Sequence, residues 1–87
     1  MKVLLFAVAR EATGGRGEVD RPLRGGADLS LAELLQELSD TYPELRRVLA
    51  HARVAVNGTY LGTGPGTGRR RLEDRDEVAI LPPYSGG

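Results

Sequence analysis

The residues best suited to chemistry in this sequence are its last six. They are, in order, Pro82, Pro83, Tyr84, Ser85, Gly86 and Gly87. Proline fixes φ and cannot continue a helix or an inner strand, and glycine has no side chain, so a carboxylate on Gly87 would stand on a thin, unhindered stalk. A tail of that shape can be threaded into the active site of another protein. The alternative is an ordinary frayed end, because chain termini are commonly disordered.

Other residues with chemical potential occur in patterns that predict structural roles. The glycine-rich stretch 62–68 fits neither spacing of the known phosphate-binding glycine motifs, so we expect a plain loop. The basic run 69–71 stands beside acidic residues and predicts a balanced, solvated face. His51 is the only histidine, which favours a surface role. Asp74 and Asp76 flank a predicted turn, where such side chains accept hydrogen bonds from the backbone.

Composition limits the remaining possibilities. The chain has 87 residues, of which 40% are hydrophobic and 28% charged, with a formal net charge of zero and no cysteine. This length supports one modest core and is too small for a deep catalytic pocket. Zero net charge argues against a nucleic-acid partner, and the lack of an apolar run of about 20 residues argues against a membrane span. We expect a cytoplasmic protein, because the apolar stretch 3–9 lacks the features of a signal peptide.

The first half of the sequence predicts strands followed by a helix. The apolar run 2–8 is typical of a central strand, and the glycines at 14 and 15 predict a turn. A weaker strand is expected at 17–22, where Pro22 would confine it to an edge. Ser30 and Glu33 have the spacing of a capping box and predict a helix over 30–40. Its core-facing stripe comprises Leu31, Leu34, Leu35 and Leu38.

The second half predicts a short helical turn and then several strands. Residues 43–50 can form the helical turn, with proline at an early position. The segment 53–57 alternates like a half-buried strand, and Asn57-Gly58 predicts a tight turn before a short returning segment at 60–61. A short strand at 69–72 and a turn at 74–76 lead to an apolar last strand at 77–81.

Two apolar strands at the chain ends, with a crossover helix between them, predict an α+β fold. The first and last strands would lie side by side in the middle of a mixed sheet, and the helix would cover one face. This is the β-grasp arrangement. We expect residues 1–87 to form a single domain, with 82–87 as a flexible functional tail projecting from the end of the sheet.

The sequence resembles the ubiquitin-like sulfur carriers, and most closely those that act as the small subunit of molybdopterin synthase. The similarity is carried by VLLFA at 3–7, RVAVN at 53–57, DEVAILPP at 76–83 and the SGG ending. The resemblance implies a ubiquitin-like β-grasp fold with no bound cofactor. It also implies that a ubiquitin-activating-type enzyme adenylates the Gly87 carboxylate with ATP, and that the carboxylate then becomes a thiocarboxylate. The large synthase subunit would use this sulfur to make molybdopterin, so the chain would not be catalytic alone.

The resemblance also implies which residues act. Gly87 would bear the sulfur, Gly86 would leave room around it, and the tail residues Pro82, Pro83, Tyr84 and Ser85 would enter the partner. Partner enzymes would dock on an apolar patch formed by Phe6, Tyr60, Ile80 and Leu81. The alternative for these four residues is burial in the core, and Tyr60 is the best candidate for exposure.

The sequence departs from the family pattern at two places. The loop at 62–68 is longer than is usual in the family, and Arg75 stands where glycine is common, which predicts either a positive φ or a different turn type.

Two alternative functions remain open. A related carrier could donate sulfur for thiamine, cysteine or transfer-RNA thiolation. A ubiquitin-like modifier could join Gly87 to lysines of target proteins, although Lys2 is the only lysine and leaves little scope for lysine-linked chains.

Overall fold

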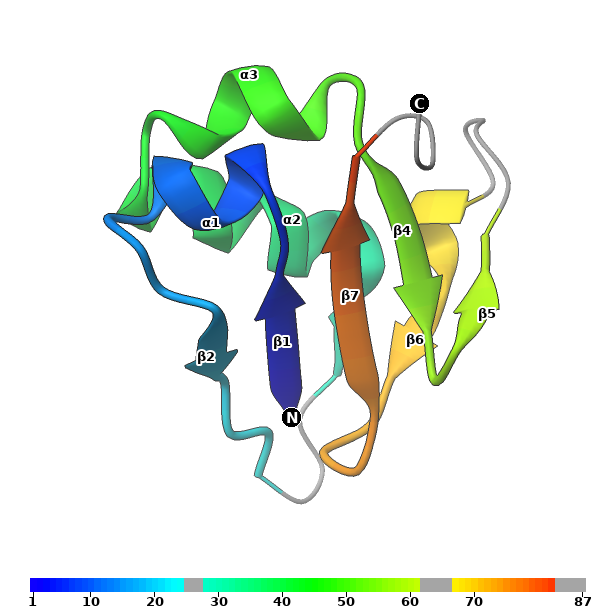
Figure 1. Ribbon diagram of the computed structural model, residues 1–87. Helices are drawn as coiled ribbons and strands as arrows, with labels where there is room; N and C mark the ends of the chain where they lie inside the picture. The colour runs from blue at the N-terminus through cyan, green and yellow to red at the C-terminus, as the bar shows by residue number, and fades with distance from the viewer. Residues whose placement is uncertain (25–27, 62–66, 83–87) are drawn as a thin grey trace.

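The first and last strands lie side by side at the centre of a five-stranded sheet (Figure 1). The computed structural model describes residues 1–24, 28–61 and 67–82. Strand β1 (Lys2–Leu5) runs parallel to β7 (Glu77–Leu81), and the sheet order is β2-β1-β7-β4-β5. The predicted mixed sheet with its central terminal strands is therefore confirmed.

The remaining elements complete the sheet and cover one of its faces. They are α1 (Val8–Ala12), β2 (Glu18–Asp20), β3 (Leu29–Ser30), α2 (Leu31–Thr41), α3 (Leu45–Leu49), β4 (Arg53–Val56), β5 (Thr59–Tyr60), the 3₁₀ helix η1 (Thr67–Arg69) and β6 (Arg71–Leu72). Strands β3 and β6 form a separate two-stranded ribbon with Leu29 opposite Leu72. No helix in the described part of the chain is long and apolar enough to cross a membrane.

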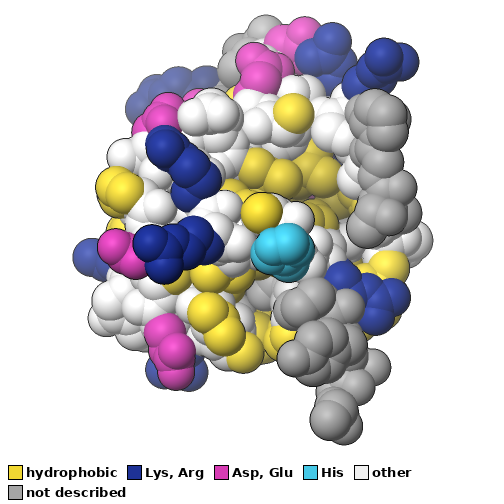
Figure 2. Space-filling model, turned by 90° about the horizontal axis from the view of Figure 1, so that it is seen from above, with side chains coloured by type: hydrophobic (Ala, Val, Ile, Leu, Met, Phe, Trp, Pro, Cys, Tyr) yellow, Lys and Arg dark blue, Asp and Glu magenta, His cyan; other side chains and the backbone are white. Residues whose placement is uncertain are grey.

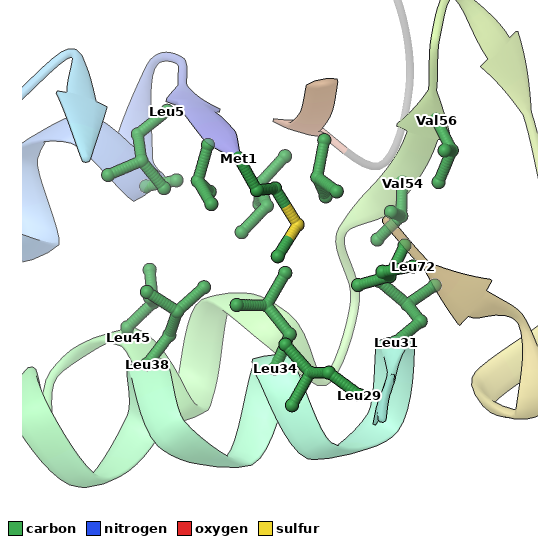
Figure 3. Packing of buried hydrophobic residues seen from close by; sticks show 14 residues of the cluster. Met1, Leu5, Leu29, Leu31, Leu34, Leu38, Leu45, Val54, Val56 and Leu72 are labelled. Carbon is green, nitrogen blue, oxygen red and sulfur yellow. The ribbon is translucent and has the colours of Figure 1, made fainter. Parts of the chain in front are cut away.

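The core lies between the sheet and α2. Alternate residues of a strand point to the same face, and the inward residues of β1, β4 and β7 meet the leucines of α2 (Figure 3). Leu31, Leu34 and Leu38 are buried, whereas Leu35 packs at the margin of the core. The predicted stripe is confirmed, with Leu35 as its less buried member.

The start of α2 forms the capping box that the sequence predicts. The Ser30 hydroxyl accepts a hydrogen bond from the Glu33 amide at 3.2 Å, and the Glu33 carboxylate accepts one from the Ser30 amide at 3.0 Å. The hydrogen bond from the Ser30 backbone is also the main cause of a lowered pKa at Glu33. Both interactions satisfy amides that a helix start would otherwise leave unpaired.

The first strand ends earlier than predicted. An apolar run predicts continued strand to residue 8, but β1 stops at Leu5 and a short helix begins at Val8. The chain changes direction at Ala7, which has a φ of 52°, and the Phe6 carbonyl accepts a hydrogen bond from the Ala9 amide. Hydrophobicity alone cannot separate a buried strand from a short helical turn, which explains the error.

The two predicted turns have different geometry. Asn57 and Gly58 both have positive φ, as a two-residue hairpin loop requires. Arg75 does not have a positive φ, so the first of the two expectations for this position is wrong. The Asp76 amide donates to the Glu73 carbonyl at 3.0 Å, and this four-residue turn accommodates an arginine without left-handed backbone.

Candidate functional site

The base of the tail is held on both sides by the sheet. Strand β7 lies between β1 and β4 and ends at Leu81, and Pro82 follows it as an exposed residue (Figure 1). The Phe6 amide donates to the Ile80 carbonyl at 3.2 Å, and Arg53 stands opposite Leu81. Because a central strand is fixed by two neighbours, the position where the tail starts is well defined. Pro83, Tyr84, Ser85, Gly86 and Gly87 lie outside the described residues, and their roles stay predictions.

An apolar row crosses the sheet face that points away from α2. We call Leu4, Ala79, Ala55 and Tyr60 the outer row, because the strand register places each beside the next on four neighbouring strands. The side chain of Tyr60 is exposed, Leu4 and Ala79 are half-buried, and Ala55 is small and buried. Small residues in the middle and a large exposed one at the edge make a shallow surface suited to contact with another protein.

The predicted docking patch is only partly on this surface. Phe6 and Tyr60 are exposed, at 45% and 56%, and Leu81 is half-buried. Ile80 is wrongly assigned to the patch, since it is 0% exposed and belongs to the core. Consecutive strand residues point to opposite faces, so Ile80 and Leu81 cannot share one surface.

Several residues on or near the outer sheet face are not predicted from the sequence. Leu4, Ala55 and Ala79 lie on the outer row, and the period-two alternation within each strand is the signal that could have found them. Val8 is 59% exposed and lies on α1, whereas the apolar run 2–8 predicts a central strand. Arg53 is a further residue of this kind. Its guanidinium carbon lies 4.8 Å from the centre of the Tyr60 ring.

A hydrogen-bonded clamp fixes the other end of β7. The buried carboxylate of Asp76 accepts from the Asn57 amide group at 2.9 Å and from the Glu73 backbone amide at 2.7 Å. The Asn57 side-chain oxygen in turn accepts from the Glu77 amide at 2.9 Å. Burial alone would raise the pKa of Asp76, but these hydrogen bonds, with Arg70 and Arg75 nearby, outweigh it and lower the pKa.

Asp74 and two arginines near the clamp, Arg71 and Arg75, have structural partners. Asp74 accepts from the Leu23 amide at 2.7 Å, which is the main cause of its lowered pKa. Arg71 pairs with Asp28 and Arg75 with Glu73, each at 2.8 Å. The turn role of both aspartates and the balanced charge around 69–71 are thus confirmed.

The described residues form no candidate metal site. No three histidine, aspartate or glutamate residues in this part of the chain are grouped to hold a metal ion, and His51 is exposed. The candidate site is instead the carboxyl end of β7, where an apolar surface lies beside the start of the tail. Such an arrangement offers another protein an apolar surface next to the point where the tail begins.

Comparison with known proteins agrees with this geometry. The ThiS family model matches residues 3–87. The molybdopterin synthase sulfur carrier subunit of Arabidopsis thaliana is 38% identical over 87 residues, covering 100% of this chain and 82% of the relative. The small archaeal modifier protein 1 of Methanosarcina acetivorans is 33% identical and has a TM-score of 0.74, covering 99% and 94% of the two chains.

A solved complex shares the fold at lower identity. In the complex of subunits 1 and 2 of the molybdopterin-converting factor from Helicobacter pylori, the matching chain is 20% identical with a TM-score of 0.67, covering 99% of this chain and 96% of that one. The matches to the family model and to the curated relative span nearly the whole sequence. This chain therefore belongs to the ThiS family, and its curated relatives are molybdopterin synthase sulfur carrier subunits.

Proposed function

We propose that this chain is the sulfur carrier subunit of a molybdopterin synthase and that Gly87 carries the sulfur as a thiocarboxylate. The observation that carries the proposal is the position of β7, which is fixed between two neighbours and leads directly into the PP-x-SGG tail. The relationship to curated sulfur carrier subunits along the whole chain supports it. A fold alone would not, because one fold hosts many functions.

The chemistry explains why the tail ends in residues without side chains. A terminal carboxylate, with a pKa of roughly 3.5, is ionised at neutral pH and does not react with sulfur nucleophiles. In the proposed sequence a carboxylate oxygen attacks the α-phosphorus of ATP and pyrophosphate leaves, giving an acyl adenylate. A sulfide-level donor then attacks the carbonyl carbon, AMP leaves, and a thiocarboxylate remains. A Cβ on Gly86 or Gly87 would crowd both attacks.

Two partners follow from this chemistry. The first is an adenylating enzyme of the ubiquitin-activating type, which would bind the ATP that the first step consumes. A large synthase subunit would receive the thiocarboxylate and hold the pterin substrate, and the H. pylori complex of two subunits offers a structural precedent for such an assembly. The exposed Phe6 and Tyr60 and the half-buried Leu81 form the part of the docking patch that lies outside the core, and they would contact both partners in turn.

Intact-mass measurement tests the proposal directly. The chain would be incubated with an activating enzyme, ATP and sulfide, and its mass should rise by the difference between a sulfur and an oxygen atom. Omitting ATP should prevent the change, because the carboxylate then keeps a poor leaving group. A carrier that stays unchanged with an enzyme that thiocarboxylates an authentic sulfur carrier would contradict the proposal.

A protein-modifier function is the second candidate. The 33% identity to small archaeal modifier protein 1 favours it, since that relative matches along nearly the whole chain. In this case a target amine, in place of sulfide, would attack the carbonyl carbon of the acyl adenylate, AMP would leave, and an amide bond would form. Isopeptide-linked products from a cell extract supplied with the activating enzyme and ATP would support the modifier function. Their absence, together with sulfur transfer to a large subunit, would favour the synthase.

A further inference from the structure

Besides the outer row, a concave surface lies beside the carboxyl end of β7. Figure 2 looks onto this end of the molecule and shows a hollow with hydrophobic side chains at its base. The groove has a volume of about 450 Å³, and its lining comes from α2, α3, β4 and the segments next to them. Its half-buried apolar residues are Leu35, Leu49, Ala52 and Leu61.

Arg53 joins this groove to the outer row. It lines the groove, stands opposite Leu81 in the sheet and places its guanidinium over the ring of Tyr60. In the part of the chain that the structure describes, no carboxylate lies within ion-pair distance of Arg53. The aromatic ring holds the guanidinium in place, and none of the described residues accepts a hydrogen bond from its side chain, so its donors can bind a partner's carboxylate.

We propose that the groove and Arg53 form a second docking site for the large synthase subunit. That subunit fills the groove with an apolar side chain and pairs a carboxylate with Arg53. The inference rests on the proposed function, because it names a further contact made by the protein that receives the tail. The large subunit would then contact both flanks of the strand from which the tail starts.

The lining of the groove fits a protein partner better than a small molecule. Small-ligand sites usually place several convergent polar groups around an apolar pocket, whereas Arg53 is the only charged residue among the described residues that line this groove. An apolar pocket with an arginine beside it is typical of the energetically dominant part of a protein interface. Arg53 and Leu81 are neighbours across the sheet, so the groove is continuous with the surface where the tail begins. A partner that binds the tail can therefore contact the groove as well.

Binding of the full-length chain to the large subunit tests the inference. Ala50 is exposed and lines the groove, so Ala50→Trp would fill the groove without removing a core side chain. Arg53→Glu would repel the partner's carboxylate. Arg46→Glu is the matched control, because Arg46 is exposed and is not among the residues that line the groove, so the variant makes the same charge change outside the lining. Calorimetric titration gives the dissociation constant of each variant, and thermal unfolding shows that each is folded.

We expect Ala50→Trp and Arg53→Glu each to raise the dissociation constant at least about tenfold, while Arg46→Glu leaves it nearly unchanged. The loss in Arg53→Glu should shrink at high salt, since screening weakens charge repulsion. Wild-type affinity in both folded groove variants, with wild-type sulfur transfer intact, would overturn the docking site and leave the carrier function standing. Equal losses in Arg53→Glu and Arg46→Glu would overturn the carboxylate pairing. A wild-type chain that neither binds nor donates sulfur would overturn both proposals.

Discussion

At the scale of single residues, Asp76 connects pH to stability. It is the only buried carboxylate among the described residues, and its folded-state pKa is lowered. A depressed pKa means that the ionised form stabilises the fold above the unfolded pKa, and that this stability is lost as pH falls through the folded pKa. The loss therefore begins below about pH 4, near the unfolded value for aspartate.

We predict that Asp76→Ala lowers the free energy of unfolding at neutral pH by about 1–3 kcal/mol, because the Glu73 amide and the Asn57 side chain lose their acceptor. Its stability should also depend less on pH in the acid range. Denaturant unfolding at neutral and acid pH measures both effects. The exposed Asp40→Ala serves as the control. A pH dependence in Asp76→Ala equal to that of the wild type would contradict the role of the clamp.

Residue patterns predict local hydrogen bonds well, but they predict unusual backbone dihedral angles poorly. The capping box at Ser30 and the turn role of Asp76 follow from short-range chemistry that the sequence contains. The positive φ of Ala7 does not, because alanine has no local reason to adopt it and the surrounding fold imposes it. The pairing of Arg53 with Tyr60 depends on strand register, which single residues do not reveal.

At the scale of elements, α2 supplies one wall of the core. We predict that Leu34→Ala lowers the free energy of unfolding by about 2–5 kcal/mol, because this fully buried side chain leaves a cavity. Leu35→Ala is the internal comparison and should cost less, since Leu35 lies at the margin of the core. Urea unfolding of both variants measures the difference. A loss below about 1 kcal/mol in Leu34→Ala would contradict this packing.

Elements with a clear periodicity or a nearby turn signal were predictable, including the short helix α3 and the short strands β2 and β5, whereas the elements without such a signal were not. The helix at 31–41 and the strands at 53–56 and 77–81 follow from leucine spacing, alternation and clear turns. The β3–β6 ribbon was only half anticipated, through a strand at 69–72, because two-residue strands carry almost no pattern. Helix α1 was missed because its apolar residues continue the run of β1.

At the scale of the whole molecule, the outer sheet face and the tail should act together. We predict that Tyr60→Asp weakens binding to the large subunit at least about tenfold without unfolding the chain, because it places a charge in an apolar contact at an exposed position. Thr41→Asp, exposed on α2, should bind normally. Surface plasmon resonance with the immobilised subunit compares them, and equal affinities would remove the patch from the interface.

Sequence and structure contribute differently to the candidate site. The tail is identified from residue types alone, since Pro82, Gly86 and Gly87 have their properties wherever they lie. The surface beside the tail is a product of folding, because Tyr60 and Leu81 end two different strands and Phe6 directly follows a third. The wrong placement of Ile80 shows the limit, since hydrophobicity does not indicate which face a strand residue occupies.

The most direct test of the account is sulfur transfer by chains altered at Gly87. Deleting Gly87 leaves the described core untouched but moves the carboxylate away from the reacting atoms, and a displacement of about 1 Å can cost a hundredfold in rate. With activating enzyme, ATP, sulfide, large subunit and pterin precursor, the full chain should form molybdopterin. The deletion, and a chain with one residue added after Gly87, should fold normally and form almost none. Normal turnover by the deletion variant, or by the extended chain without trimming, would contradict the sulfur-carrier account.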